Sequence, residues 1–255
     1  MANQSTILKA YIEDRRARNF AGYQYEDLGY LIRHFPLRGN QKGWVQFACI
    51  PESKLDQTIK DQIDFFADKK VPFEWKVHNF DQPKILADRL VAHGFVADEE
   101  EHLMVYESTS EPEILPLKLP DPIIIEKVRG KKEFSAICKF QENIWQTNLS
   151  DLFEYIIDHE SIFSFYIAKA HGEIIGSGWT EFLEGSDFPE LHGGAVAPQW
   201  RGKGIYTALL AERIQESKLK GYPYISVDAA PMSYPILKAK GFTSLATSRP
   251  FHLQL

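Results

Sequence analysis

The chain has 255 residues, of which 44% are hydrophobic and 25% charged, and its formal net charge is −6. This length and composition indicate a globular protein with one large domain or two of ordinary size. An acidic chain lacks the basic face that general nucleic-acid binding requires, so we expect no nucleic-acid partner. No apolar run approaches the ~18 residues of a membrane helix, and residues 1–16 do not read as a signal peptide, so we expect no membrane partner and a cytoplasmic location. Cys49 and Cys138 form no ligand pattern, so we expect reduced thiols and no metal.

The first half of the chain alternates between predicted helices and strands. Apolar residues at helical spacing predict helices over residues 5–18, from Pro51 onward, and from Pro83 to a cap at Gly94. Strand patterns cover five segments, namely residues 23–25, 31–35, 44–50, 73–77 and 103–106. Residues 38–41 form a predicted turn.

A change of composition separates the two halves. Residues 107–122 contain four prolines among acidic and small residues, which is typical of a semi-extended linker. We therefore predict a first domain over 1–108, a linker over 109–121 and a second domain over 122–255.

The second half again mixes strands and helices. Its predicted strands are residues 123–128, 162–168, 174–182, 191–197 and 224–228, with one or two more after Phe242. Its predicted helices are residues 134–145, 152–157, 204–220 and 233–240. A tight turn at His171-Gly172 joins the second and third of these strands.

A glycine-rich turn stands between the strand over 191–197 and the long helix. It reads Gln199-Trp200-Arg201-Gly202-Lys203-Gly204, directly after a Val-Ala-Pro sequence. Two glycines one residue apart let the backbone take positive φ angles and approach a ligand closely. They stand at a helix N-terminus, where outward-pointing N–H groups and the helix dipole favour a phosphate. The spacing fits neither the G-x-G-x-x-G fingerprint nor the G-x-x-x-x-G-K-[ST] loop.

The pattern Q-x-x-G-x-G after Val-Ala-Pro resembles the pyrophosphate loop of the GNAT family of N-acetyltransferases. A second match is the helix over 233–240 with its terminal Gly241-Phe242, and the order of strands and helices is also that of the family. The resemblance covers roughly residues 121–255. It implies an α/β fold in which a mixed, twisted sheet carries helices on both faces, and a cofactor site where two parallel strands splay apart, one ending at Val196 and the other at Asp228.

The first half looks like a decayed copy of the second. Leu90 to Phe95 parallels Leu237 to Phe242, and the segment ending at Pro51 parallels the one ending at Pro198. Lys54, Leu55 and Gln57 stand in the first half where the second has Arg201, Gly202 and Gly204. The resemblance therefore implies two GNAT-like domains, of which only the second has a phosphate loop, and we expect acetyl-CoA to bind there alone.

The resemblance also implies binding roles toward acetyl-CoA. The strand end at Val196 and Ala197 would pair with the pantetheine arm. The backbone from residue 201 to residue 206 would hold the pyrophosphate, namely Arg201, Gly202, Lys203, Gly204, Ile205 and Tyr206. Ser233 is a further candidate for contact with acetyl-CoA, although its position at a helix start also suits an N-cap.

The catalytic residues are less clearly marked. The family's usual acid is a Tyr four residues before the terminal Gly, but this position holds Leu237. Tyr234, one turn earlier on the same helix, could take that role or could serve only in packing. Candidate bases are His192, because histidine in general titrates near neutral pH, and Asp228, which could instead bind the substrate's ammonium group.

Glu181 and the pair Gly193-Gly194 are further residues with a possible function in the site. Glu181 is a third candidate base, although we interpret it as a surface residue. Gly193-Gly194 would weaken a strand and often marks close approach by a ligand.

Three hypotheses follow from the sequence. The first is an acetyl-CoA-dependent N-acetyltransferase that acts on a primary amine of a small molecule or a peptide. The second is a catalytically silent acyl-CoA-binding module with a regulatory or interaction role, which Leu237 supports. The third, a purely structural pair of domains, leaves the Gly-Lys-Gly loop without a purpose. The sequence does not predict the oligomeric state.

Overall fold

The computed structural model describes residues 3–38, 41–109, 114 and 117–253. Backbone contacts divide the chain into two compact units. The first unit comprises Met1–Met104, Asp228–Ala239 and Thr243–Leu255, and the second comprises Val105–Val227 and Lys240–Phe242. The domains expected from the sequence are continuous segments of the chain, whereas each of these units combines separate segments. The expected boundaries stay a prediction. The predicted turn over 38–41 and the predicted linker over 109–121 lie partly outside the described residues.

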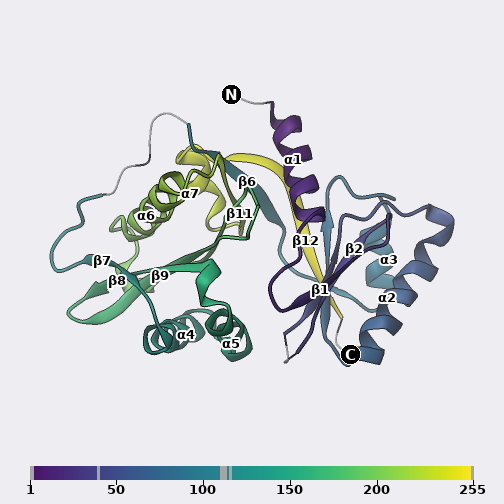
Figure 1. Ribbon diagram of the computed structural model, residues 1–255, viewed down its shortest axis with the longest axis horizontal. Helices are drawn as coiled ribbons and strands as arrows, with labels where there is room; N and C mark the ends of the chain where they lie inside the picture. Colours follow the sequence, from purple (N-terminus) through teal and green to yellow (C-terminus); the bar gives the residue numbers. More distant parts are fainter. Residues whose placement is uncertain (1–2, 39–40, 110–113, 115–116, 254–255) are drawn as a thin grey trace. The chain divides into compact units, whose positions relative to one another are not determined.

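The first unit is built on a mixed sheet (Figure 1). Its strands are β1 (Tyr23–Asp27), β2 (Ile32–Pro36), β3 (Gly43–Gln46), β4 (Phe73–His78), β5 (Val96–Ala97) and β12 (Thr243–Leu253). Its helices are α1 (Gln4–Arg16), α2 (Leu55–Lys69), α3 (Leu86–Ala92) and α7 (Tyr234–Ala239). The strand order is β1-β2-β3-β4-β12, with β5 paired to β12. Only β3 and β4 in this series run parallel.

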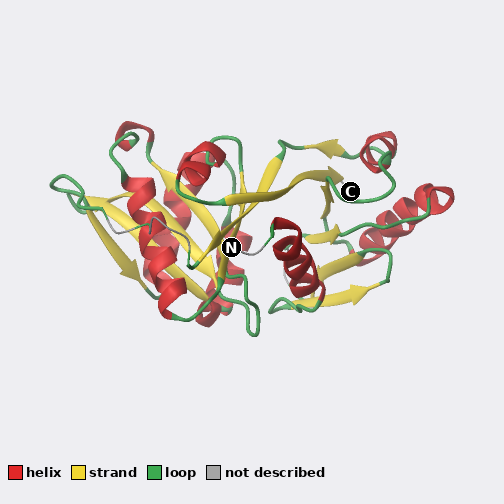
Figure 2. Ribbon diagram, turned by 90° about the horizontal axis from the view of Figure 1, so that it is seen from above, coloured by secondary structure: helices red, strands yellow, loops and turns green. Residues whose placement is uncertain are grey.

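The core of the first unit lies between its sheet and the helices α2 and α3. Leu55, Ile59 and Phe66 recur at helical spacing on one face of α2 and are buried. They pack with Trp75 of β4 and Phe251 of β12 in one apolar cluster. Helix α1 contacts β12, and Figures 1 and 2 show the helices of this unit set against its strands.

The second unit has a sheet in the order β11-β10-β9-β8-β7. Its strands are β7 (Ile124–Val128), β8 (Phe163–Ala170), β9 (Glu173–Glu181), β10 (Glu190–Val196) and β11 (Tyr224–Ala229). Its helices are α4 (Lys131–Trp145), α5 (Ser150–Asp158) and α6 (Ile205–Leu219). Strands β11 and β6 (Glu101–Glu107) each contain residues of both units.

Helices cover both faces of the sheet in the second unit, as Figure 1 shows. Helices α4 and α5 pack on one face, where Phe165 and Trp179 contribute to the core. Helix α6 packs on the other face through Ile205 and Leu209, which meet Val196 of β10. The expected fold class, a mixed sheet between two helical layers, is therefore confirmed.

The same order of elements occurs in both halves of the chain. Parallel β3 and β4 flank α2, and parallel β10 and β11 flank α6. Strands β10 and β11 share the single registered pair Glu190↔Ser226, at the start of β10, so they separate toward their carboxyl ends. Parallel strands that diverge in this way open a cleft for a ligand at the edge of the sheet.

The corresponding opening in the first unit is closed by backbone pairing. Beyond the β3–β4 ladder, Cys49 and Gln82 form an isolated parallel bridge. The N–H of Ile50 donates to the carbonyl of Gln82 at 2.9 Å, and the N–H of Gln82 donates to the carbonyl of Ala48 at 2.9 Å. These bonds occupy the backbone groups that a cofactor arm would need, and α2 begins without a glycine loop.

A buried carboxylate ties α6 to the sheet of the second unit. Glu216 accepts hydrogen bonds from Lys127 at 2.7 Å, from Tyr166 at 3.1 Å and from Ser164. Burial alone would raise the pKa of Glu216, but the hydrogen bonds from Lys127 and Ser164 outweigh it and hold the pKa below its usual value.

This cluster predicts a pH-dependent contribution to stability. A carboxyl group whose pKa is lower in the folded state stabilises the protein above its ordinary pKa, and this contribution is lost as pH falls through the folded value. Glu216→Gln should lower the free energy of unfolding by about 2 kcal/mol at pH 7. This difference in the free energy of unfolding should become smaller as the pH falls below about 4.5, the usual pKa of a glutamate side chain. Urea unfolding at several pH values measures it, with the exposed Glu173→Gln on β9 as control. Equal losses of unfolding free energy in Glu216→Gln and Glu173→Gln would contradict a stabilising role of the buried Glu216 carboxylate.

Among the described residues, no helix is both long enough and apolar enough to cross a membrane.

Candidate functional site

The glycine-rich loop lies between β10 and α6 of the second unit. A short 3-10 turn over Pro198–Trp200 leads into extended backbone at Arg201. Gly202 and Gly204 have φ angles of 75° and 82°, and α6 begins at Ile205. The first bond that closes the helix runs from the N–H of Ala208 to the carbonyl of Gly204 at 2.9 Å. The earlier amides of this turn therefore point out of the helix end, as an anion site requires.

The surroundings of the loop leave room for a phosphate. A Cβ placed on Gly202 would meet no atom within 4 Å, so the space beside this residue is open. The exposed Arg201 directs its Nε to the carbonyl of Val196 at 3.2 Å, and Lys203 holds its ammonium 4.8 Å from the ring centre of Trp200. Both positive charges thus stay beside the loop, where they add to the helix dipole.

A bulge interrupts β10 before the loop. His192 pairs with Trp179 and Ala195 pairs with Ser177, so two residues of β10, Gly193 and Gly194, oppose one residue of β9. Gly193 has a φ of 61°, and a Cβ there would lie 1.8 Å from the Trp179 ring. A Cβ on Gly194 would lie 2.9 Å from the Tyr206 ring. The rings of Trp179 and Tyr206 leave no space for a Cβ at either position, so they explain the glycine pair without a ligand.

The guanidinium of Arg213 lies beneath the bulge and is 2% exposed. It donates to the carbonyls of Leu209 at 3.0 Å, His192 at 3.2 Å and Trp179 at 3.4 Å. Burial lowers the pKa of Arg213 below its usual value. From the opposite face, Gln141 of α4 donates to the carbonyl of Gly193 at 2.8 Å. Hydrogen bonds from two helices therefore fix the backbone of the bulge.

His192 lies on the α4 side of the sheet, next to a buried carboxylate. Its Nε2 is 3.4 Å from Oε2 of Glu181, which is 7% exposed and not on the surface as we expected from the sequence. His192 pairs with Trp179, and Glu181 stands two residues further along β9, so the two side chains are diagonal neighbours. The imidazole of His192 thus has a carboxylate as its neighbour, an arrangement that can orient a general base.

Asp228, the other predicted base, is bound to a lysine of the first unit. Lys76 of β4 donates to the Asp228 carboxylate and also lies 3.0 Å from Glu101. Burial alone would lower the pKa of Lys76, but these carboxylates outweigh it and raise that pKa well above its usual value. The Asp228 charge is therefore balanced by an ammonium of the protein itself.

Tyr234 and its neighbours on α7 also belong to the first unit. The Tyr234 ring stacks on His102 with centroids 3.9 Å apart, and its hydroxyl accepts from Lys238 at 3.3 Å. Ser233 donates its hydroxyl to the carbonyl of Ala230 at 3.0 Å. Leu237, at the position expected for the family's Tyr, is fully buried.

The predicted site residues thus fall into two groups. The second unit contains the strand end at Val196 and Ala197, the whole loop to Tyr206, and His192. Asp228, Ser233 and Tyr234 belong to the first unit. The sequence did not indicate the role of Arg213 or the burial of Glu181. The available signal for Glu181 was strand alternation, which places it on the same face as Trp179. In the described part of the chain, no group of three or more His, Cys, Asp or Glu side chains is arranged to hold a metal.

Comparison with known proteins finds a family match within the second half of the chain. Residues 132–232 match the model of the acetyltransferase (GNAT) family. No curated protein matches the chain significantly.

Solved structures share the fold along the whole chain. A GCN5-related N-acetyltransferase from Kribbella flavida is 14% identical, with a TM-score of 0.71 over 99% of this chain and 96% of that chain. Another from Sphaerobacter thermophilus is 13% identical, with a TM-score of 0.65 over 88% and 76% of the respective chains. A tandem GNAT protein from the clavulanic acid biosynthesis pathway is 9% identical, with a TM-score of 0.62 over 96% and 87%. The chain has the fold of these proteins, and its residues 132–232 match the model of the acetyltransferase (GNAT) family.

Proposed function

We propose that the protein is an acetyl-CoA-dependent N-acetyltransferase that acetylates a primary amine of a small molecule or a peptide. The observation that supports this most directly is the loop at Gly202 and Gly204, with positive φ angles, open space beside Gly202 and a helix N-terminus. Beside it, β10 and β11 diverge, as strands that receive an extended cofactor arm between them would. Both features fit acetyl-CoA, and the closed opening of the first unit does not.

The proposed binding roles follow the course of the chain from β10 to α6. The backbone of Val196 and Ala197 would hold the pantetheine arm. The amides between Arg201 and Tyr206 would hold the pyrophosphate, with Arg201 and Lys203 supplying positive charge. Acetyl-CoA supplies the activated acyl group as a thioester.

The proposed catalysis rests on proton transfer by side chains of this chain. His192 would accept the proton of the acceptor's ammonium group, and Glu181 would stabilise the resulting imidazolium. The neutral amine nitrogen then attacks the thioester carbonyl carbon, the carbon–sulfur bond breaks, and the nitrogen releases its second proton to solvent, from which Tyr234 is reprotonated. Tyr234 is the proposed proton donor to the leaving sulfur. Asp228 stays a candidate for holding the ammonium group of the acceptor, although Lys76 already balances its charge.

Calorimetry with acetyl-CoA tests the binding site. We expect micromolar binding by the wild type, and a loss of at least about 100-fold in Gly202→Glu with Gly204→Glu, because two carboxylates would repel the pyrophosphate. The matched control is Gly172→Glu with Gly221→Glu. These glycines also have positive φ angles and open surroundings, but they lie away from the loop. Absence of binding by the wild type, or equal losses in both double variants, would refute the proposed site.

Turnover distinguishes the enzyme from a silent acyl-CoA-binding module. With a library of primary amines, we expect at least one acetylated product. Tyr234→Phe should then lower kcat by about 100-fold while the Kd for acetyl-CoA stays unchanged. Unchanged kcat would show that Tyr234 is not the acid. Binding of acetyl-CoA without turnover of any amine would favour the silent module, which the buried Leu237 supports.

A further inference from the structure

The ring of Tyr234, the proposed proton donor, stacks on an imidazole from a distant strand. Tyr234 is the first residue of α7, and His102 is on β6. The two ring centroids are 3.9 Å apart and the ring planes differ by 24°, which is a stacked arrangement. Both residues belong to the first unit, so their contact is a property of that unit alone.

The imidazole of His102 is itself held in place. Its strand, β6, is hydrogen-bonded to β12 and β11 in the sheet. Nδ1 of His102 lies 3.3 Å from Oγ of Ser244 on β12, and both side chains are half-buried. A ring that is attached to a central strand and bonded to the next one is a firm support for a side chain that packs on it.

Helix α7 alone gives Tyr234 little support. The helix has six residues, of which Leu237 is the buried one. Ile236 is 37% exposed, and Met232, just before the helix, is 71% exposed. A short helix with a single buried side chain does not fix the direction of its first residue. The stack on His102 therefore supplies an orientation that the helix itself does not.

The hydroxyl of Tyr234 keeps its own proton available. Its oxygen accepts a hydrogen bond from Nζ of Lys238 at 3.3 Å, and a phenol that accepts in this way can still donate its O–H. Lys238 is exposed, so this contact is too weak to set the direction of the ring. Proton transfer requires the donor within hydrogen-bond reach of the acceptor, and a small displacement lowers the rate. The direction of the Tyr234 ring thus depends mainly on His102.

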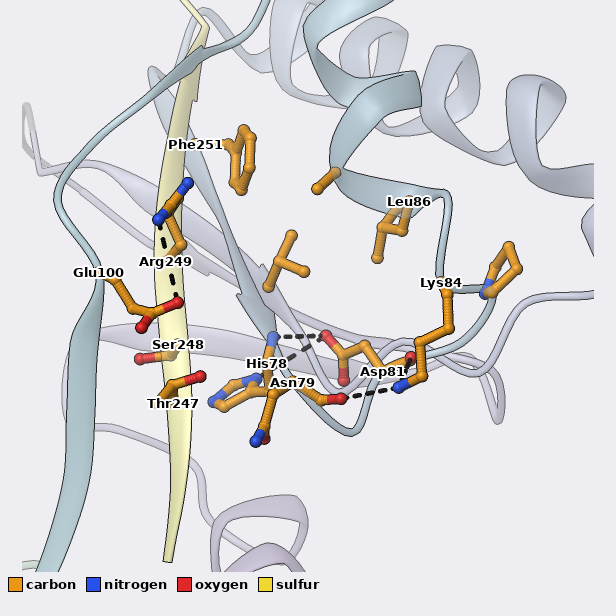
Figure 3. Close-up of a pocket in the computed structure, with 13 residues that line it drawn as sticks. His78, Asn79, Asp81, Lys84, Leu86, Glu100, Thr247, Ser248, Arg249 and Phe251 are labelled. Carbon is orange, nitrogen blue, oxygen red and sulfur yellow. Dashed lines mark hydrogen bonds and ion pairs between the residues drawn. The ribbon is translucent and has the colours of Figure 1, made fainter. Parts of the chain in front are cut away.

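The pocket of the first unit takes no part in this arrangement. It has a volume of about 240 Å³ and lies between the end of β4, the start of α3 and β12 (Figure 3). The cations that line it already have partners in the protein, because Lys84 donates to backbone carbonyls and Arg249 pairs with Glu100. Neither His102 nor Tyr234 is among the described residues that line it. A small molecule in this pocket would therefore not touch the stack.

We propose that His102 is a positioning residue for Tyr234. Its imidazole holds the phenol ring in the direction from which the hydroxyl gives its proton to the leaving sulfur. The proposal rests on the proposed function, since His102 acts only through Tyr234. It requires no covalent change of His102 and no transfer of a proton from it.

Turnover of an amine identified in the library screen tests this role. His102→Ala should lower kcat about 10-fold, which corresponds to the loss of one aromatic stack, while the Kd for acetyl-CoA stays unchanged. His102→Phe keeps a ring in the same place and should restore kcat to within about 2-fold of the wild type. The matched control is His93→Ala, at a histidine of the same unit that lies beside Asp56, and it should change neither value.

A double variant separates positioning from a general effect on the fold. In the Tyr234→Phe background, His102→Ala should change kcat by less than about 2-fold, because the hydroxyl that His102 directs is absent. Ser244→Ala removes only the partner of the imidazole. It should give a smaller loss of kcat, and it remains informative if His102→Ala fails to fold. Equal losses in both backgrounds, a loss that His102→Phe does not restore, or unchanged kcat in His102→Ala and Ser244→Ala would overturn the proposal.

The result for Tyr234→Phe keeps this proposal apart from the proposed function. If Tyr234→Phe loses activity and His102→Ala does not, His102 has no positioning role and the proposed function stands. If the wild type acetylates no amine, or if Tyr234→Phe keeps full activity, the proposed chemistry itself fails, and the role of His102 fails with it.

Discussion

Gly193→Ala is expected to destabilise the second unit by about 3–5 kcal/mol. The new Cβ would lie 1.8 Å from the Trp179 ring, and three ring atoms lie within 2.4 Å of it. Trp179 cannot move aside easily, because it is buried between Phe153 and Phe165 in the core under α4 and α5. The φ angle of 61° adds the cost of a left-handed conformation for a residue with a side chain.

A second glycine separates the two contributions to this loss. Gly172 has a φ of 84°, but a Cβ there would meet no atom within 4 Å. Gly172→Ala should therefore cost only about 1 kcal/mol, which is the backbone term alone. Urea unfolding of both variants measures the difference. Equal losses of unfolding free energy would show that the Trp179 ring is not the reason why position 193 requires glycine.

Arg213→Met should destabilise the protein by about 2–4 kcal/mol, because three carbonyl groups lose a charged donor in a buried place. The same guanidinium also restricts the residue opposite the bulge, Gly178, to glycine. A Cβ on Gly178 would lie 2.8 Å from two of its atoms. Gly178→Ala alone should thus be strongly destabilising.

A double-mutant cycle tests this contact directly. In the Arg213→Met background the flexible methionine can yield, so Gly178→Ala should cost at least about 1 kcal/mol less than in the wild type. The free energies of unfolding of the four proteins give the coupling. Additive losses would mean that Arg213 stabilises the bulge only through its hydrogen bonds.

Local patterns in the sequence predicted most of the elements. The apolar spacing on α2 and α6 and the glycines at the ends of α3 and α6 mark helices that the structure places within a few residues of the expected bounds. The two-residue strand β5 was not predicted, because two residues carry no periodicity. The family resemblance located the phosphate loop because its glycines and the following helix are contiguous in the chain.

Contacts between distant segments could not be read in this way. Lys76 and Asp228 are 152 positions apart, and nothing in the local sequence of either residue indicates the other. The glycine pair of β10 suggested a ligand, whereas the ring of Trp179 on the neighbouring strand explains Gly193. The pairing of β12 with β4, which lies far away in the chain, is a further contact of this kind.

The position of β12 in the first unit also constrains how the protein is made. Residues 248–253 complete the sheet beside residues 73–78, although the ribosome adds them after every other strand and helix of the described chain. Until they emerge, β4 has one open edge and Trp75 and Phe73 lack the cover of Phe251. The nascent first unit therefore exposes an unpaired strand edge throughout the translation of the second unit, and this is the period in which a chaperone would protect it from aggregation.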